Sequence, residues 1–324
     1  MKAAVYDHTG GPEVLRYDDV PDPALRPDGV VIEVGAVGIQ GGDLLHRQGG
    51  ELPTVPHIVG YQAAGVIREV GSDVDGDHLA SGQAVVAVML AGSHAELVSV
   101  PARSVWAVPP GLSVQQAAGI PIEFATAHDC LFEFGHLAPG ESVLVQAGAG
   151  GVGLAAIQLA KAAGATVLAT ASSDARLERL RGYGVDHPIN YATHDVAAET
   201  VAVTEGKGAD LVVDPVGGKV LESSIEALAY RGRISWVGRA GRDDENPDVW
   251  PLSRKNGSLT GVFLGAEMFA RTERLRPLIA ALIEQVAGGE LQVVVDRTYS
   301  LAEAADAHRY IESRQAFGRV LLIP

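Results

Sequence analysis

The sequence predicts an α/β protein of two domains, one rich in β-strands and one built on a parallel sheet with helices on both faces. In roughly the first 110 residues, short apolar runs are separated by Gly, Pro and Asp, which is typical of strands joined by turns. Between Ser113 and Gly288, apolar runs alternate with helix-length stretches, the pattern of a parallel sheet. A length of 324 residues suits two domains of roughly 100–200 residues each.

The expected elements follow the chain in that order. In the first part, we expect strands over residues 30–34, 65–70, 84–89 and 95–100. In the second part, we expect strands over 142–146, 165–170, 209–214, 233–237 and 258–264, and helices over 152–163, 174–182 and 219–230. After Gly289 the pattern predicts a strand over 291–295, a helix over 301–313 and a last strand over 319–323.

The composition excludes several classes of protein. Against 25 Lys and Arg stand 40 Asp and Glu, a formal charge of −15, so the surface as a whole should repel nucleic acid and anionic membranes. The one cysteine, Cys130, rules out a disulfide within the chain and a four-cysteine zinc site, and we expect it in the core. No apolar run has the length of a signal peptide or of a membrane span. The sequence therefore predicts a soluble, cytoplasmic protein.

A glycine-rich segment between an expected strand and helix carries the strongest functional signal. Gly148, Gly150 and Gly153 fit G-x-G-x-x-G, with the apolar run 142–146 before them and an Ala- and Leu-rich stretch after them. Such glycines permit a tight turn and close approach to a pyrophosphate, and the helix N-terminus offers N–H groups and partial positive charge to phosphates. The motif predicts a dinucleotide site; a glycine-rich turn without a ligand is the alternative.

The end of the next expected strand indicates which dinucleotide binds. An NAD site places an acidic residue there, which accepts hydrogen bonds from the ribose. Here the strand ends in Ala171-Ser172-Ser173, and Arg176 follows within one helical turn. Hydroxyls and a guanidinium suit the dianionic 2′-phosphate of NADPH, so we expect NADPH. Asp174 then caps the helix, and a solvated surface role is the alternative for Arg176.

Together with these motifs, the sequence resembles the medium-chain dehydrogenase/reductase superfamily and, within it, the zinc-independent quinone oxidoreductase branch. The resemblance covers nearly the whole chain. Besides the glycine motif it is carried by MKAAVYDHTGGPEVL at the start, GAVGIQGGDLLHRQG (35–49), VGYQAAGVIREVG (59–71), GSHAELVSVP (92–101), AAGIPIEFATAH (117–128), DPVGG (214–218) and FGRVLLIP (317–324).

The resemblance implies the domain organisation and the oligomeric state. A GroES-like β-barrel domain would comprise residues 1–115 with 290–324, and a Rossmann domain with a doubly wound parallel sheet would comprise 116–289. The active site would lie in the cleft between them, where ligand sites are common. Relatives commonly dimerise through the edge strand of the Rossmann sheet, which would be 258–264 here. We expect a homodimer, since an unpaired apolar edge is prone to aggregation.

The residues at the family's metal-binding positions argue against a catalytic metal. Zinc-dependent relatives carry Cys in the segment that matches 38–40, and His-Glu where this chain has Tyr61-Gln62. With Gln40, Tyr61 and Gln62 there, thiolate and imidazole ligands are missing. Without a Lewis acid, hydride has to reach an acceptor that is electrophilic by itself, such as a quinone or an activated alkene.

The expected cofactor contacts come from the motifs and from matching positions. The glycine motif and the strand tip give Gly148, Gly150, Gly151, Val152, Gly153, Ser172, Ser173 and Arg176, and matching positions add Thr126, Tyr191, Val216, Val237, Gly238, Phe263, Leu264 and Arg319. Alternatives stay open for four of them. Tyr191 could be a half-buried aromatic at a strand end, Phe263 and Leu264 core or dimer residues, and Arg319 a surface-strand residue.

On the substrate side, the resemblance points to Gln40, Asp43 and Tyr61 as candidate catalytic residues. Gln40 stands where the family usually has Asn, and Asp43 matches a frequent family aspartate. A tyrosine often found two residues after that aspartate is Leu45 here. The proton donor is then Tyr61, His46 or solvent, and a packing role is the alternative for Tyr61.

Three functions remain in competition. The first is NADPH-dependent reduction of a quinone-like acceptor, and the second is an enoyl or 2-alkenal reductase, for example in secondary metabolism. Reduction of an alkene needs a proton at carbon, whereas a quinone anion takes its protons from water, so a well-placed Tyr61 would favour the second. The third is an NADPH-binding sensor without turnover.

Overall fold

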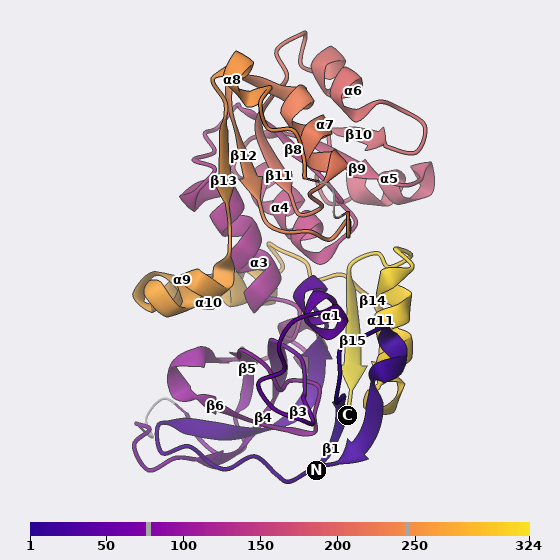
Figure 1. Cartoon of the computed structure of the whole chain (residues 1–324). Helices are drawn as coiled ribbons and strands as arrows, with labels where there is room; N and C mark the ends of the chain where they lie inside the picture. The colour runs from indigo at the N-terminus through magenta and orange to yellow at the C-terminus, as the bar shows by residue number, and fades with distance from the viewer. Residues whose placement is uncertain (76–78, 244–245) are drawn as a thin grey trace. The chain divides into compact units, whose positions relative to one another are not determined.

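The computed structural model describes residues 1–75, 79–243 and 246–324 (Figure 1). Contacts between residues divide the chain into two units. The first comprises Met1–Ile122 and Arg271–Pro324, and the second comprises Glu123–Ala270. Each unit has its own sheet.

Helix α10 (Thr272–Ala287) belongs to the first unit, whereas the resemblance assigned this stretch to the Rossmann domain. Three hydrogen bonds explain the difference. The indole Nε1 of Trp106 donates to the carbonyl of Arg276 at 3.0 Å. The guanidinium of Arg276 in turn donates to the carbonyls of Arg103 at 2.8 Å and Val105 at 3.1 Å. The helix is thereby tied to the strand-rich part of the chain.

The first unit is built on a seven-stranded mixed sheet with the order β14-β15-β3-β4-β5-β7, in which β6 also pairs with β3. Only β14 and β15 run parallel to each other. The strands are β3 (Gly29–Gly38), β4 (Gln62–Val70), β5 (Ala84–Val88), β6 (Leu97–Pro101), β7 (Val105–Ala107), β14 (Val295–Ser300) and β15 (Arg319–Ile323), beside the hairpin of β1 (Lys2–Val5) and β2 (Arg16–Asp19). The four strands expected in the first 110 residues are confirmed.

Strand β3 contributes several side chains to the hydrophobic core of this unit. Its apolar residues Val30, Ile32, Val34 and Val37 are buried in one hydrophobic cluster, and β3 also has partner strands on both edges. Burying each such side chain stabilises the fold by about 1.5–3 kcal/mol. The helices of the unit are α1 (Gly41–Gln48), α2 (Val114–Ala117), α10 and α11 (Ala304–Glu312). The strand expected over 291–295 is wrong, since β14 begins only at Val295.

The second unit has a six-stranded, fully parallel sheet with the order β10-β9-β8-β11-β12-β13 (Figure 1). Its strands are β8 (Ser142–Val145), β9 (Thr166–Ala171), β10 (His187–Asn190), β11 (Ala209–Asp214), β12 (Leu228–Trp236) and β13 (Ser258–Gly261). Its helices are α4 (Gly151–Ala162), α5 (Asp174–Arg181), α6 (Val196–Val203), α7 (Lys219–Ala227), α8 (Leu252–Lys255) and α9 (Leu264–Ala270), and α3 (Pro121–His128) leads into it. The order reverses between β8 and β11, and ligands of such sheets bind beside the carboxyl ends of the strands at this point.

The sequence did not predict α6, α8 and α9, and three further elements of the second unit differ from the expectation. The sequence did not predict β10, because Pro188 interrupts its apolar pattern; as an edge strand, β10 tolerates a residue without an N–H. The helix expected over 219–230 ends at Ala227, where Leu228 turns extended and pairs with Ala209 of β11. The strand expected over 258–264 ends at Gly261, and Leu264 begins α9.

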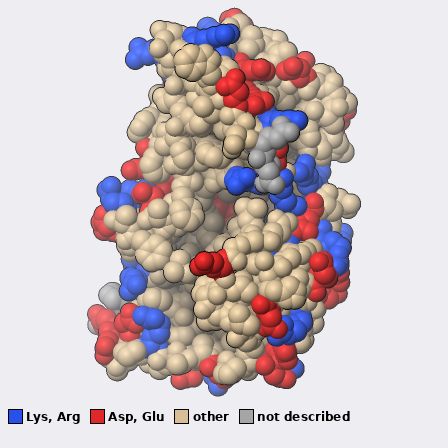
Figure 2. Space-filling model, viewed as in Figure 1, with Lys and Arg blue, Asp and Glu red and all other residues tan. Residues whose placement is uncertain are grey.

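The surface carries both signs of charge. Figure 2 shows acidic and basic side chains scattered in small groups over one face of the molecule. Within the described ranges, no helix combines the length and the apolar character needed to cross a membrane.

Candidate functional site

The glycine turn lies at the carboxyl end of β8, beside the reversal of the strand order. Helix α4 begins at Gly151, and its N-cap residue Gly150 provides no side-chain cap. A Cβ on Gly153 would lie 2.4 Å from the carbonyl oxygen of Ala147, so only glycine lets the helix close onto the turn. A Cβ on Gly150 would meet no atom nearer than 3.4 Å, and Gly150 is exposed. The turn therefore leaves the first N–H groups of α4 accessible.

A chain of buried hydrogen bonds holds this turn, and we call its side chains Asp214, Ser224, Gln146 and Thr170 the loop network. The hydroxyl of Ser224 donates to Asp214 Oδ2 at 2.9 Å, and Gln146 Nε2 donates to the Ser224 hydroxyl at 3.1 Å. The hydroxyl of Thr170 donates to Gln146 Oε1 at 2.9 Å and accepts from the N–H of Ala147 at 3.0 Å. All four side chains are at most 3% exposed.

Asp214 also shapes the turn after β11. Its Oδ1 accepts hydrogen bonds from the N–H groups of Val216 at 2.8 Å and Gly217 at 3.0 Å. Gly217 and Gly218 have φ of +73° and +56°, a backbone conformation that favours glycine. Burial raises the pKa of Asp214, and the hydrogen bonds from Gly217, Val216 and Ser224 oppose that rise. One buried carboxylate thus links the turns that follow β8 and β11.

The residues expected to select the cofactor meet at the ends of β9 and β10. Ser172 and Ser173 follow β9 and are partly exposed, and Arg176 lies in the first turn of α5. The N–H of Tyr191 donates to the carbonyl of Ala171 at 3.2 Å, which places Tyr191 beside the tip of β9. The Tyr191 side chain is 47% exposed. The structure therefore brings these four residues together.

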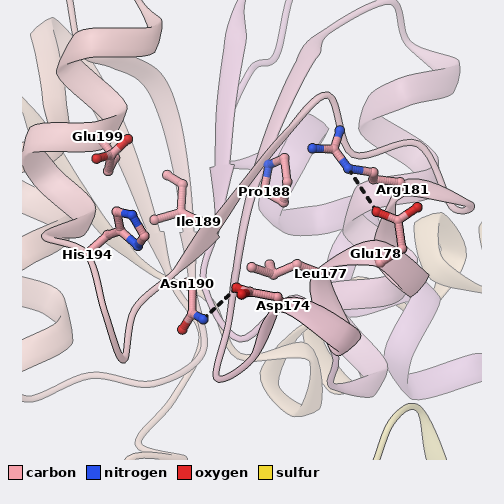
Figure 3. A pocket seen from close by; sticks show the side chains of 9 residues that line it. All are labelled: Asp174, Leu177, Glu178, Arg181, Pro188, Ile189, Asn190, His194 and Glu199. Carbon is pink, nitrogen blue, oxygen red and sulfur yellow. Dashed lines mark hydrogen bonds and ion pairs between the residues drawn. The ribbon is translucent and has the colours of Figure 1, made fainter.

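Asp174, a carboxylate near the tip of β9, makes a hydrogen bond to β10. Its Oδ1 accepts a hydrogen bond of 2.7 Å from the amide of Asn190 on β10 (Figure 3). Both residues line a hollow of about 240 Å³ along the edge strand. The hollow is lined by Asp174, Leu177, Glu178, Arg181, Pro188, Ile189, Asn190, His194 and Glu199. The expectation that Asp174 caps α5 is wrong: the N-cap is Ser173, no side-chain cap hydrogen bond is present, and Asp174 bonds to β10 instead.

The remaining candidates of the second unit differ in exposure. Val216 follows the end of β11, and Val237 and Gly238 follow β12, at the same edge of the sheet as the glycine turn. Thr126 on α3 is 5% exposed. Leu264 is buried and begins α9, whereas Phe263 beside it is 73% exposed.

The three candidate catalytic residues lie around the start of α1 in the first unit. Gln40 is the N-cap of this helix, and its N–H donates to Asp43 Oδ2 at 2.8 Å in a capping box. Both side chains are at most 6% exposed. The guanidinium of Arg319 donates to the carbonyl of Ile39, so it holds the residue directly before Gln40. The phenol of Tyr61 donates to the carbonyl of Gly42 at 3.4 Å.

Tyr61 keeps its proton at neutral pH. Burial raises the pKa of Tyr61 to about 12, and the nearby Asp43 and Tyr6 add to the rise. A Cβ on Gly42 would lie 2.8 Å from Cε2 of the Tyr61 ring, so glycine at this position allows the ring to lie against α1. Tyr61 remains partly exposed and can act as a proton donor.

Gln62, beside Tyr61, has a structural role. Its side chain is fully buried, and its Oε1 accepts a hydrogen bond from the N–H of Ile122 at 3.1 Å. Across the ranges that the structure describes, no three His, Cys, Asp or Glu side chains are grouped as metal ligands would be. Cys130 is fully buried, and burial strongly raises the pKa of its thiol.

Several buried polar residues of the first unit join separate segments of the chain. Arg47 on α1 is fully buried, donates to the carbonyl of Gly10 at 2.8 Å and pairs with Glu312 on α11. Next to it, Nε2 of His94 lies 3.1 Å from Nε2 of His308, also on α11, and both rings are fully buried. Burial lowers the pKa of His94 to about 3 and lowers that of His308 as well. These contacts join segments that are far apart in the sequence.

Comparisons with known proteins agree with this architecture. Residues 26–110 match an alcohol dehydrogenase GroES-like domain, and residues 151–284 match a zinc-binding dehydrogenase domain. A quinone oxidoreductase of Pseudomonas aeruginosa is 32% identical over 97% of each chain. A 2-haloacrylate reductase of a Burkholderia species is 32% identical over 100% of this chain and 99% of that protein.

Two further similarities concern length and fold. A synaptic vesicle membrane protein VAT-1 homolog of Danio rerio is 33% identical over 93% of this chain, which spans 65% of that relative's length. The crystal structure of Escherichia coli quinone oxidoreductase complexed with NADPH has a TM-score of 0.94, 29% identity and full coverage of both chains. The predicted combination of a GroES-like and a Rossmann domain is confirmed. The chain therefore belongs to the medium-chain dehydrogenase/reductase superfamily, in its quinone oxidoreductase branch.

Proposed function

We propose that this protein is an NADPH-dependent oxidoreductase that transfers hydride, without zinc, to a quinone-like acceptor. One observation carries the proposal. The glycine turn, an uncapped helix N-terminus and the set Ser172, Ser173 and Arg176 lie on adjacent strands at one edge of the parallel sheet. When bound, the cofactor supplies a hydride at its nicotinamide ring; the protein's own residues bind it and orient the acceptor.

The glycine turn fits the pyrophosphate of a dinucleotide. The N–H groups of Gly151, Val152 and Gly153 lie in the first turn of α4 and have no partner within the helix. The open space at Gly150 allows a phosphate to approach the backbone closely. The loop network fixes the turn in this shape before a ligand binds, which lowers the entropy lost on binding.

The tip of β9 fits a 2′-phosphate better than a pair of ribose hydroxyls. A guanidinium and two hydroxyls can donate hydrogen bonds to a dianion, and charged hydrogen bonds of this kind are the stronger ones. The hydrogen bond from Asn190 ties one oxygen of the Asp174 carboxylate to β10. We therefore propose a preference for NADPH over NADH.

Zinc-free chemistry follows from the residues at the family's ligand positions. Gln62 uses its side-chain oxygen to hold Ile122, and Tyr61 keeps its phenolic proton. Neither Gln40 nor Gln62 offers the thiolate or imidazole that zinc prefers. The acceptor then has to be electrophilic without help from a metal, as a quinone is.

A second candidate, reduction of an α,β-unsaturated carbonyl, is favoured by Tyr61. Hydride would go to the β-carbon and the phenolic proton of Tyr61 to the α-carbon. The 2-haloacrylate reductase among the relatives has a name consistent with reduction of an activated alkene. Burial and, after it, the nearby Asp43 raise the pKa of Tyr61 to about 12, so the phenol carries its proton at neutral pH.

We also propose a homodimer that forms through β13. Strand β13 is an edge strand of the parallel sheet. Three large aromatic side chains on β13's neighbouring segments are exposed: Tyr230 on β12, Phe263 after β13 and Phe269 on α9, at 69%, 73% and 67%. A second copy of β13 would satisfy the edge and cover apolar surface. A monomeric mass by light scattering at micromolar concentration would contradict the dimer.

Steady-state oxidation of NADPH tests the proposed function. The purified protein is assayed with 9,10-phenanthrenequinone and with a 2-alkenal, each against a chelator-treated sample. We expect turnover that the chelator does not reduce. Turnover with quinones alone supports the first candidate, and turnover with the alkenal supports the second. If the protein binds NADPH but reduces neither the quinone nor the alkenal, both candidate functions are wrong. The NADPH-binding sensor without turnover would then remain.

A further inference from the structure

Two turns of the second unit lie against each other at the carboxyl ends of the neighbouring strands β11 and β12. We call residues 215–218 the β11 turn and residues 237–243 the β12 turn. The N–H of Ala240 donates to the carbonyl of Pro215 at 3.0 Å. The N–H of Gly241 donates to the carbonyl of Val216, also at 3.0 Å. The backbones of the two turns are thus joined directly.

Glycines make this close approach possible. A Cβ on Gly217 would lie 2.9 Å from the carbonyl oxygen of Gly238. A Cβ on Gly218 would lie 2.6 Å from both Cβ and Oδ2 of Asp243. Any larger residue at either position would push the turns apart, because atoms at these distances overlap. The glycines of the β11 turn therefore leave room for the β12 turn and, in particular, for the side chain of Asp243.

The side chain of Asp243 joins the end of the β12 turn to the start of α7. Its Oδ2 accepts a hydrogen bond of 3.1 Å from the N–H of Lys219, the first residue of α7. The N-cap residue Gly218 has no side chain that could accept this bond. The first N–H groups of a helix have no partner within it and carry partial positive charge, so a carboxylate is favourable there. Asp243 thus caps α7 from the turn after the next strand.

The strand order places both turns next to the proposed cofactor site. In the order β9-β8-β11-β12, the tip of β9 is the proposed 2′-phosphate site, and the glycine turn after β8 is the proposed pyrophosphate site. A dinucleotide that continues in this direction reaches the ends of β11 and β12 with its nicotinamide half. The candidate contacts there are Val216 in the β11 turn and Val237 and Gly238 in the β12 turn.

We propose that Asp243 is a positioning residue for the nicotinamide half of the cofactor. This rests on the proposed function. By holding the β12 turn on the start of α7, the carboxylate keeps Val216, Val237 and Gly238 in one arrangement before the cofactor binds. A site that is already ordered loses less conformational entropy on binding. Asp243 acts through these residues and not by contact with the cofactor.

The test compares the whole cofactor with a fragment. Adenosine 2′,5′-bisphosphate carries the 2′-phosphate but has no nicotinamide. In Asp243→Ala, we expect NADPH to bind about tenfold more weakly and the fragment to bind as it does to the parent protein. Arg176→Ala should weaken both ligands, because both carry the 2′-phosphate. Asp243→Asn keeps a side-chain oxygen that can accept from the N–H of Lys219, so it should retain most of the NADPH affinity.

A matched control separates positioning from the loss of a helix cap. Asp195 is the N-cap residue of α6, and its Oδ1 accepts a hydrogen bond of 2.9 Å from the N–H of Ala198. Asp195→Ala removes a contact of the same kind and should leave the affinity for both ligands unchanged. If Asp243→Ala binds NADPH as the parent does, or weakens NADPH and the fragment equally, Asp243 does not position the nicotinamide half.

Amide hydrogen exchange gives a second readout without any ligand. In the protein without cofactor, the N–H groups of Ala240 and Gly241 should exchange faster in Asp243→Ala than in the parent, because the β12 turn is no longer held on α7. Equal exchange rates would overturn the proposal and leave the proposed function standing. If the parent binds neither NADPH nor the fragment, the proposed function itself is wrong, and the role of Asp243 towards the cofactor fails with it.

Discussion

Two groups of buried polar side chains, one in each unit, differ in their hydrogen bonding. In the second unit, the loop network satisfies every link from Asp214 to the N–H of Ala147 with hydrogen bonds of 2.9–3.1 Å. In the first unit, the hydroxyl of Tyr6, both ring nitrogens of His57 and Nδ1 of His308 have no partner within the described residues. The satisfied network holds the glycine turn in place, whereas each unsatisfied group is buried without a replacement for its hydrogen bonds to water.

The largest expected effect is a loss of stability in acid from the His94–His308 pair. In the unfolded chain each histidine takes up a proton below about pH 6.5, whereas burial lowers the pKa of His94 to about 3 in the fold and lowers that of His308 too. The unfolded state therefore binds more protons, and the stability present above pH 6.5 is lost as the pH falls. At pH 5 we expect a loss of about 2 kcal/mol in the free energy of unfolding from His94, and His308 adds to this loss.

Denaturant unfolding at several pH values measures this loss. The groups that face the pair are Ser93 and Arg47, and Arg47 adds to the lowering of the His308 pKa. His308→Gln should remove part of the acid loss, and the exposed control His8→Gln should remove none. If the free energy of unfolding depends on pH in the same way in the parent, His308→Gln and His8→Gln, the acid loss does not come from the His94–His308 pair.

The next largest effect concerns Asp214 in the loop network of the second unit. Asp214→Ala leaves the Ser224 hydroxyl and the N–H groups of Val216 and Gly217 without their acceptor in a buried place. We expect the free energy of unfolding to fall by about 3 kcal/mol. Asp18→Ala, at an exposed aspartate of β2, should change it by less than about 0.5 kcal/mol. Equal effects at the two positions would mean that the network adds nothing to stability.

A smaller change separates stability from binding. Thr170→Val removes the hydroxyl that joins Gln146 to the N–H of Ala147, at nearly constant volume. We expect a loss of about 1–2 kcal/mol in stability and weaker NADPH binding, because the glycine turn loses its support. Thr166→Val, at an exposed position of the same strand β9, is the control. NADPH affinity that is unchanged in Thr170→Val would show that the network does not position the turn.

The smallest expected effect has the opposite sign. Tyr6→Phe removes a buried hydroxyl without a partner, so we expect the free energy of unfolding to stay the same or to rise by up to about 1 kcal/mol. Tyr310→Phe, which removes a hydroxyl that donates to Asp296 at 2.8 Å, should instead lower it slightly. A clear loss of stability in Tyr6→Phe would mean that the Tyr6 hydroxyl makes a stabilising hydrogen bond.

The sequence predicted those features that depend on local pattern. The alternation of apolar runs and helix-length stretches predicted five of the six strands of the parallel sheet, and the glycine motif predicted the turn after β8. Strand β10 escaped prediction because its short, proline-containing segment becomes a strand only by pairing with β9. The end of α7 at Ala227 depends on pairing between Leu228 and Ala209, which no local pattern encodes.

The candidate site divides in the same way. Ser172, Ser173 and Arg176 follow each other in the chain, so a strand tip could be predicted from their order. Thr170 and Gln146 could not be linked to Asp214 and Ser224, because 44 residues separate Thr170 from Asp214 and only the fold brings them together. Tyr6 and His57 gave no signal for the same reason.

The preference for NADPH tests the central claim most directly. Calorimetric titration of the parent protein with NADPH and with NADH should show NADPH binding at least about tenfold more tightly, since a charged hydrogen bond contributes about 1.5–3 kcal/mol. Arg176→Ala should remove most of that difference by weakening NADPH and leaving NADH unchanged. NADH binding as tightly as NADPH, or a preference that survives Arg176→Ala, would contradict the assignment of the β9 tip as a 2′-phosphate site.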